Sequence, residues 1–293
     1  SDGVAATIAE LVTINNATSG TVTLNSQTIA ANYSDTAVNL AAAFSGITTH
    51  TGTIAITGTN PTITQLNNIS GATSGVVTAT ISDTAANLAT LTTASTDAIT
   101  ITISDGVAAT IAELVTINNA TSGTVTLNSQ TIAANYSDTA VNLAAAFSGI
   151  TTHTGTIAIT GTNPTITQLN NISGATSGVV TATISGTATN LATLTTASTD
   201  AITITISEGS TATIAELKSI NAATSGTVTL STETIAANYS DTAANLAAAF
   251  SGITTHTGNL TISETSTATI AELVTINAAT SGTVTLSTET IAA

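Results

Sequence analysis

Residues 82–103 read SDTAANLATLTTASTDAITITI, and this stretch combines a helical pattern, a polar turn and a strand pattern. The apolar side chains of Ala85, Leu88 and Leu91 recur at every third position, which is typical of a short α-helix or 3₁₀ turn with one buried face. Isoleucine and threonine then alternate through residues 98–103, so their side chains point to opposite faces of a strand. A module of this length cannot bury its apolar face alone, and we therefore predict that neighbouring modules stack.

The same pattern recurs along the whole chain in modules of about 22 to 33 residues. Each module begins with a polar start such as Ser-Asp or Ser-Glu and ends with a Thr/Ser/Gly loop and a strand. In one module type the apolar positions follow full α-helical spacing, and we expect Ser34 or Asp35 to be the N-cap residue there. Further apolar sets that predict helical segments are Ile8/Leu11/Ile14, Ile63/Leu66/Ile69 and Ala37/Leu40/Ala41/Phe44.

A longer repeat groups these modules. Residues 1–103 recur as 104–206 with two differences, Asp83 against Gly186 and Ala86 against Thr189. The third copy, 207–293, is shortened and rearranged, because a new module starts at Ser263 directly after the THTG near Thr257. We interpret residues 1–293 as a single array of modules that can be lost individually.

These patterns predict a β-solenoid-like tandem repeat, elongated and right-handed, with one strand and a short helix or 3₁₀ turn per module. All strands would join one continuous parallel sheet, with the helical turns on its other side. The longer modules carry the extra segment 28–33, which we expect to add a second strand. Neither end shows a capping module, so the end strands would expose unpaired edges.

Composition limits the functional classes. The chain has a net charge of −15 and a single Lys or Arg, so it cannot neutralise nucleic-acid phosphates or bind an anionic membrane surface. We find no apolar run of the roughly 18 residues needed to span a bilayer. The absence of cysteine removes disulfides, thiolate metal sites and thiol nucleophiles. With 42% hydrophobic residues and two prolines, the chain is also unlike a disordered segment.

Histidine appears at one repeated position. The motif ITTHTG contains His50, His153 and His256. A catalytic triad needs one unique constellation rather than copies of a loop, and copies separated by a whole long repeat are poorly placed to share a metal ion. We therefore predict a histidine at a turn before a strand, with no catalytic role.

Acidic residues recur at two positions of the modules. Aspartates at module starts would favour helix N-termini, because the helix dipole stabilises negative charge there. The alternative is calcium coordination, with candidates Asp2, Asp35, Asp105, Asp138 and Asp241. The change of Asp83 to Gly186 favours the helix-terminal role. The glutamates before the central leucine are interpreted as solvated surface charge: Glu10, Glu113, Glu216 and Glu272.

The threonines of the strands form a third recurring pattern. Thr-x-Thr pairs such as Thr78/Thr80 and Thr100/Thr102 would lie on one sheet face. Regular Thr-x-Thr arrays suit ice binding, but threonine also simply suits an exposed strand, and lateral packing of arrays is a third use.

The stretches Ser82–Ala89 (SDTAANLA) and Thr7–Leu11 (TIAEL) resemble repeat regions of very large secreted bacterial surface proteins, including cyanobacterial hemolysin-type adhesin-like proteins. The resemblance covers essentially the whole chain. It implies an extracellular or cell-surface location and roles in matrix, filament or adhesion. The GGxGxD repeats of calcium-binding RTX proteins are absent, so the resemblance does not support calcium-driven folding.

We therefore predict a non-enzymatic, acidic structural protein without a cofactor: a segment or subunit of a self-assembling surface filament, sheath or biofilm matrix fibre. The alternatives are the stalk of a large bacterial adhesin and an ice-binding protein. Expected partners are further copies, end to end or laterally, and surface polysaccharide. The chain lacks a signal peptide and an initiator Met and starts in mid-pattern, so we expect an internal fragment or a processed product.

Overall fold

The computed structural model describes residues 3–58, 60–104, 106–161, 163–263, 268–286 and 291–292. The calcium candidates Asp2 and Asp105 lie outside these described residues. The chain divides into two compact units, the first made of 1–134 with 145–153 and the second of 135–144 with 154–293. This boundary does not coincide with the long-repeat boundary after residue 103. The prediction of a single array stays a prediction.

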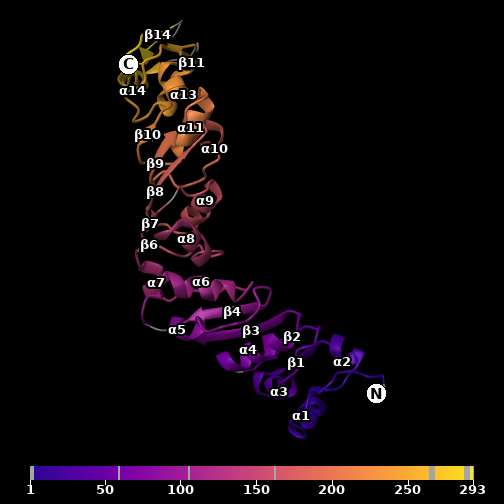
Figure 1. Cartoon of the computed structure of the whole chain (residues 1–293). Coiled ribbons are helices and arrows are strands. Elements are labelled where there is room, and N and C mark those ends of the chain that lie inside the picture. Colours follow the sequence, from indigo (N-terminus) through magenta and orange to yellow (C-terminus); the bar gives the residue numbers. More distant parts are fainter. Residues whose placement is uncertain are drawn as a thin grey trace. The chain divides into compact units, whose positions relative to one another are not determined.

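The first unit contains one five-stranded parallel sheet in the order β1-β2-β3-β4-β5, with helices in the connections between strands (Figure 1). Its strands are β1 (Tyr33–Thr36), β2 (Ile54–Thr57), β3 (Val77–Asp83), β4 (Ala98–Ile103) and β5 (Val125–Thr126). Its helices are α1 (Ile8–Asn16), α2 (Ser26–Ala30), α3 (Ala37–Ala43), α4 (Ile63–Ala72), α5 (Ala85–Leu88), α6 (Ile111–Asn119) and α7 (Ser129–Ala133).

The second unit contains a five-stranded sheet in the order β10-β9-β8-β7-β6, a three-stranded sheet β11-β12-β14 and the pair β13-β15, all parallel. Its strands are β6 (Tyr136–Thr139), β7 (Ile157–Thr160), β8 (Val180–Gly186), β9 (Ala201–Ile206), β10 (Val228–Thr229), β11 (Tyr239–Asp241), β12 (Leu260–Ile262), β13 (Ala268–Thr269), β14 (Val284–Leu286) and β15 (Ile291–Ala292). Helix α8 (Ala140–Ala146) begins in this unit, and the others are α9 (Ile166–Ala175), α10 (Ala188–Leu191), α11 (Ile214–Ala222), α12 (Thr232–Ala236), α13 (Ala243–Ala249) and α14 (Ile270–Ala279).

The predicted β-solenoid with one continuous sheet is wrong. The described residues form an α/β protein with separate parallel sheets of five, five and three strands, a further strand pair and fourteen helices. One reason is that the apolar triplets continue as α-helices of up to ten residues. A second reason is that residues 28–30 of the segment expected to form an extra strand belong to helix α2, whose N-cap residue is Asn25. Strand β5 stops after two residues, and β6 begins a new sheet.

Threonine, not aspartate, caps most of the helices. The prediction that Ser34 or Asp35 caps α3 is wrong, because the N-cap residue is Thr36, whose hydroxyl accepts from the backbone N–H of Asn39. Asp35 stands one residue earlier, and its Oδ1 accepts from the Thr36 backbone N–H at 2.7 Å and from the Asn39 side-chain amide at 2.8 Å. Asp35, the residue before the N-cap, therefore stabilises the start of α3 through these two hydrogen bonds.

The cores are made of the apolar faces that the sequence alternation predicts. In β4, Ile99, Ile101 and Ile103 are buried, whereas Thr100 between them is exposed. The helices contribute leucines such as Leu88 of α5, which is fully buried.

Candidate functional site

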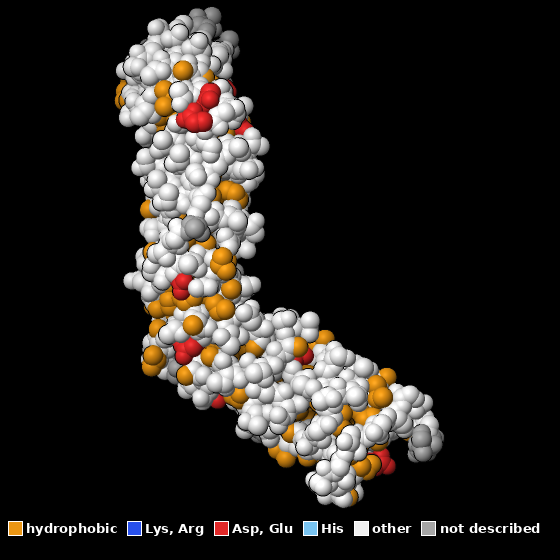
Figure 2. Space-filling model, in the orientation of Figure 1, with side chains coloured by type: hydrophobic (Ala, Val, Ile, Leu, Met, Phe, Trp, Pro, Cys, Tyr) orange, Lys and Arg blue, Asp and Glu red, His pale blue; other side chains and the backbone are white. Residues whose placement is uncertain are grey.

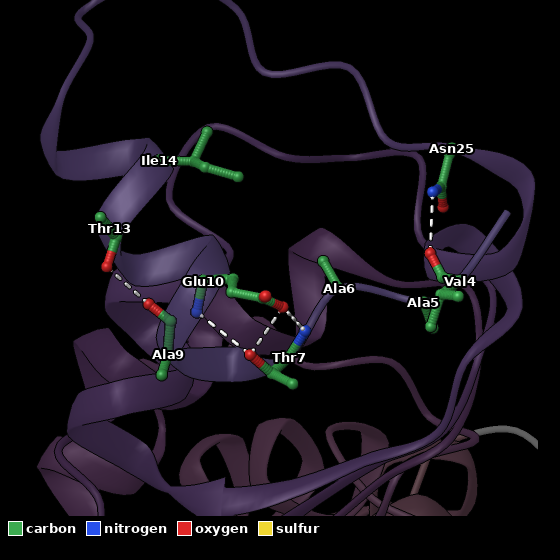
Figure 3. A pocket seen from close by; sticks show the side chains of 9 residues that line it. All are labelled: Val4, Ala5, Ala6, Thr7, Ala9, Glu10, Thr13, Ile14 and Asn25. Carbon is green, nitrogen blue, oxygen red and sulfur yellow. Dashed lines mark hydrogen bonds between the residues drawn. The ribbon is translucent and has the colours of Figure 1, made fainter. Parts of the chain in front are cut away.

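The described residues contain four complete capping boxes of the form Thr-x-x-Glu at the start of the TIAEL helices. In the first, the Glu10 carboxylate accepts from the Thr7 backbone N–H and from the Thr7 hydroxyl, both at 2.8 Å (Figure 3). The glutamates predicted to be solvated surface charge therefore have a structural role, which the Thr-x-x-Glu spacing could have revealed. The boxes are Thr7/Glu10, Thr110/Glu113, Thr213/Glu216 and Thr269/Glu272.

The calcium candidates are used in local hydrogen bonds. Asp138 and Asp241 repeat the arrangement of Asp35, each accepting from the next backbone N–H and from an asparagine amide. The Asn39 amide and the Thr36 N–H hold the pKa of Asp35 below its usual range, and equivalent donors do so for Asp138. Among the described residues, no group of three or more His, Asp or Glu side chains converges on one point.

The histidines, which were predicted to lie at a turn before a strand, are buried among aromatic rings. His50 is 1% exposed, with its ring centroid 4.9 Å from that of Phe44 and 5.5 Å from that of Tyr33. Its Nε2 donates to the Ala31 carbonyl oxygen at 2.9 Å, and its Nδ1 lies 3.0 Å from the Thr73 hydroxyl. Burial lowers the pKa of His50, as it does that of His153 and His256.

A buried aspartate was missed by the sequence reasoning. Asp97 is 1% exposed, and its carboxylate accepts from the Ser70 hydroxyl at 2.6 Å, the Val77 N–H at 2.8 Å and the Ala94 N–H at 3.2 Å. Asp200 makes the same bonds in the second unit, to Ser173, Val180 and Ala197. These carboxylates therefore join successive modules through hydrogen bonds.

The most distinctive surface of the first unit lies along α1. A groove of about 640 Å³ lies there, and Figure 3 shows Thr7, Glu10 and Ile14 along it. Ile14 is exposed, whereas the corresponding Ile117, Ile220 and Ile276 are fully buried. The groove is lined by Val4, Ala5, Ala6, Thr7, Ala9, Glu10, Thr13, Ile14 and Asn25.

The copy in the same unit shows what covers such a helix. Helix α5 packs against α6, and the Thr93 hydroxyl donates to the Ala120 carbonyl oxygen at 2.6 Å. The strand that follows passes Thr121, whose Oγ1 accepts from the Ile99 N–H at 2.9 Å and lies 2.7 Å from the Ile99 carbonyl oxygen. This covering segment comes from the preceding module, 82–103.

Among the described residues, the corresponding surface at α1 is open. We call Ile14, Ala17, Thr18 and Gly20 the α1 face; all four are exposed, whereas Ile117, Ala120 and Thr121 are buried. The hydroxyl of Thr18 accepts from the Gly20 N–H at 2.9 Å, as Thr121 does from Gly123 at 2.8 Å. The turn of the α1 face thus has the local hydrogen bond of its covered copy.

A second open surface lies in the second unit on α14. We call Ile270, Val274 and Leu286, which are exposed, the α14 face. Its groove is about 550 Å³ and is lined by Ile270, Leu273, Val274, Asn277, Ala278, Val284 and Leu286. The related helices α1 and α11 are covered on this side by α3 and α13 respectively, where Asn15 donates to the Ala43 carbonyl and Asn221 to the Ala249 carbonyl, both at 2.7 Å. No described helix follows α14.

Threonines line the outer face of the sheets. Thr36 pairs with Thr57, and Thr80 pairs with Thr100, all four being exposed. Neighbouring strands lie about 4.8 Å apart, so the two threonines of each pair lie side by side at about that spacing. The second unit repeats the arrangement with the pairs Thr139/Thr160 and Thr183/Thr203.

The surface visible in Figure 2 is mostly uncharged, with acidic side chains in isolated spots and hydrophobic side chains between them. In the part of the chain that the structure describes, every helix is too short or too polar to cross a bilayer. No protein-family model matches the chain, and no curated protein or solved structure matches it significantly. The resemblance to bacterial surface repeats stays a prediction.

Proposed function

We propose that this protein is a structural, non-enzymatic component of an extracellular surface filament, sheath or matrix, in which further modules of the repeat cover the α1 face and the α14 face. One observation carries the proposal: identical TIAELVTI helices are covered inside the chain and open at α1. The Ile14 side chain is 46% exposed, against 0% for Ile117. Burial of such apolar surface is the main driving force of protein association.

The two open faces are of different kinds. At the α1 face, a covering segment would add a strand and a helical turn in front of α1, as 82–103 does for α6. At the α14 face, a covering segment would add a helix behind α14, as α3 does for α1. Association through unlike faces is heterologous, and such contacts build open chains of subunits rather than closed dimers.

An extracellular position is supported by the resemblance of the repeats and not by the geometry. An adhesin stalk would share the same repeats and the same location. The two functions differ in self-association, because a stalk segment acts within one polypeptide and a filament subunit joins other copies.

Electron microscopy of the isolated protein, first with calcium and then with a chelator, tests the proposal. We expect uniform fibres that survive chelation, because the described calcium candidates Asp35, Asp138 and Asp241 are engaged in helix-terminal hydrogen bonds. Separate single particles at every concentration would contradict the filament proposal and favour the stalk.

Ice binding is a second candidate, favoured by the paired threonines of the outer sheet face. The pair Thr80/Thr100 gives adjacent exposed hydroxyls on neighbouring strands. Thermal hysteresis of the purified protein is the direct test. A hysteresis that disappears in Thr80→Lys/Thr100→Lys, and persists in Val107→Lys on another exposed position, would establish this function.

A further inference from the structure

We infer that the buried histidines are acid-sensitive joints between modules: when a proton binds, the chain opens locally around the histidine while neighbouring strands stay paired. This inference goes beyond the proposed function and does not depend on it, because it concerns contacts inside the chain. We call His50 with its contacts in the first unit the His50 joint, and His256 with its contacts in the second unit the His256 joint.

His50 connects the modules on both sides of it. Its Nε2 donates to the Ala31 carbonyl oxygen at 2.9 Å in the preceding module, and its Nδ1 lies 3.0 Å from the Thr73 hydroxyl in the following one. Its backbone N–H donates to the Ala72 carbonyl oxygen at 3.3 Å, and its carbonyl oxygen accepts from the Ser74 N–H at 3.0 Å. One residue therefore holds three successive modules together.

The His256 joint repeats these backbone connections in the second unit. The His256 N–H donates to the Ala279 carbonyl oxygen at 3.2 Å, and the His256 carbonyl oxygen accepts from the Ser281 N–H at 3.0 Å. The N–H of the next residue, Thr257, donates to the Ile235 carbonyl oxygen in the preceding module at 2.8 Å. The joint is therefore a property of the repeated motif and not of one copy.

The surroundings of the buried His50 ring do not favour a positive charge. The groups that face it are Tyr33 of β1, Phe44 at the end of α3, the Ala31 carbonyl after α2 and the Thr73 hydroxyl after α4. Tyr33 is the titratable group among them, and it stays neutral between pH 5 and pH 8 because burial raises its pKa. Neutral acceptors offset only part of the cost of burying an imidazolium, and no carboxylate is among these described groups.

Opening of a joint is linked to protonation of its histidine. In an opened joint the ring reaches water and has the ordinary histidine pKa of about 6.5. In the closed joints, burial lowers the pKa of His50 and of His256. Protons therefore bind the open form more tightly, and the open form gains up to ~30-fold in relative population between pH 8 and pH 5.

The opening is expected to stay local, because the neighbouring strands have their own pairing and their own buried side chains. Strand β3 pairs with β4 over six residues of each strand, and neither strand contains a histidine. Ile99 and Ile101 of this ladder are fully buried. Parts of a repeat protein that have their own core can stay folded while a neighbouring part opens. Proton uptake at His50 should therefore leave this ladder paired.

Hydrogen–deuterium exchange of the intact protein, read by mass spectrometry of peptides at pH 5, 6, 7 and 8, tests the inference. Labelling times are scaled to the intrinsic exchange rate at each pH. We expect peptide 251–262 of the His256 joint to exchange roughly 10- to 30-fold faster at pH 5 than at pH 8 after this scaling. The strands β4 and β9, which have the same sequence, should change by less than about twofold.

His256→Gln is the matched variant, and the unchanged His50 joint is its control in the same molecule. Peptide 251–262 differs in sequence from peptide 45–56, so one sample reports both joints, although 45–56 shares its sequence with 148–159. Because glutamine does not titrate, the pH response should disappear at 251–262 and persist at 45–56. If His256→Gln does not fold, His50→Gln gives the same test, since its peptide 45–56 then differs in mass from 148–159.

The pattern of exchange decides the outcome. Acceleration confined to the histidine peptides, and lost at the substituted joint, would support the inference. An equal acceleration of all peptides at pH 5 would show global unfolding and overturn it. Unchanged protection of 251–262 at pH 5, or a pH response that persists in His256→Gln, would overturn it as well.

Discussion

Ile14 and Ile117 occupy the same position of two identical nine-residue helices, and Ile14 is 46% exposed whereas Ile117 is 0% exposed. The difference arises from the neighbours and not from the helix itself. Helix α5 packs against α6, whereas α1 packs against α3 and its α1 face is exposed. Each residue of the α1 face can therefore be compared with the corresponding residue of the second copy of the repeat.

The two isoleucines should respond differently to truncation. We expect Ile117→Ala to lower the free energy of unfolding by about 2–5 kcal/mol, because it opens a cavity in the core. Ile14→Ala should cost less than ~1 kcal/mol, since its side chain is already half in water. Urea unfolding of both variants measures the difference. Equal losses would show that the α1 face is covered in the free protein.

The buried carboxylate of Asp97 should be important for stability. We expect Asp97→Asn to lower the free energy of unfolding by roughly 1–3 kcal/mol, because an amide cannot accept from Ser70, Val77 and Ala94 as a carboxylate does. Asp83→Gly is the control, since the equivalent residue of the second copy is Gly186, and it should cost under ~1 kcal/mol. Denaturant titration measures the free energy of unfolding of both variants. An Asp97→Asn variant as stable as the wild type would exclude the proposed role of this network.

The buried histidines should make stability depend on pH. Burial lowers the pKa of His50, His153 and His256, so the unfolded chain binds more protons than the folded one below the ordinary histidine value of about 6.5. Stability should be complete above that value and fall as pH drops below it. Urea midpoints from pH 8 to pH 5 measure this slope.

His50→Gln tests the origin of the slope. The variant removes one of the three titrating groups, so the loss of stability between pH 8 and pH 5 should become smaller than in the wild type. An unchanged slope would contradict the histidine origin. The carboxylates of Asp35 and Glu272, whose pKa values are lowered by hydrogen bonds to backbone and side chains, do not produce a slope in this pH range. Their contribution is lost only at lower pH, below about 4.5.

Calcium should have little effect on the folded protein. The Oδ1 atoms of Asp35, Asp138 and Asp241 already accept two hydrogen bonds each. We expect the Tm in 5 mM calcium and in excess chelator to agree within about 1 °C, because no ligand that binds the folded state is removed. A fall of several degrees on chelation would reinstate coordination at the module starts.

The local elements were largely accessible to sequence reasoning, and the assembly of the sheets was not. The triplet Ile8/Leu11/Ile14 located α1, and the alternation in 98–103 located β4. The prediction of a continuous sheet was wrong because alternation of side chains does not show where the pairing of strands ends. Strand β5 has only two residues. The prediction of a strand at 28–33 was wrong because residues 26–30 form helix α2, which begins after its N-cap residue Asn25.

The candidate site was hidden for a different reason. The TIAELVTI helices have identical or nearly identical sequences, so periodicity assigns Ile14 and Ile117 the same buried face. Whether this isoleucine is exposed depends on the module that precedes the helix, and the sequence of the helix carries no information about that module. The burial of His50 was also missed, because its Phe44 and Tyr33 partners come from separate elements.

Sedimentation velocity over a concentration series tests the central claim most directly, using the wild type, Ile14→Asp and Val107→Asp. Val107 is 67% exposed and lies outside both open faces, so its variant controls for the added charge. We predict that the weight-average sedimentation coefficient rises with concentration for the wild type and Val107→Asp and stays constant for Ile14→Asp. A constant coefficient for the wild type, or the same rise in all three proteins, would contradict association through the α1 face.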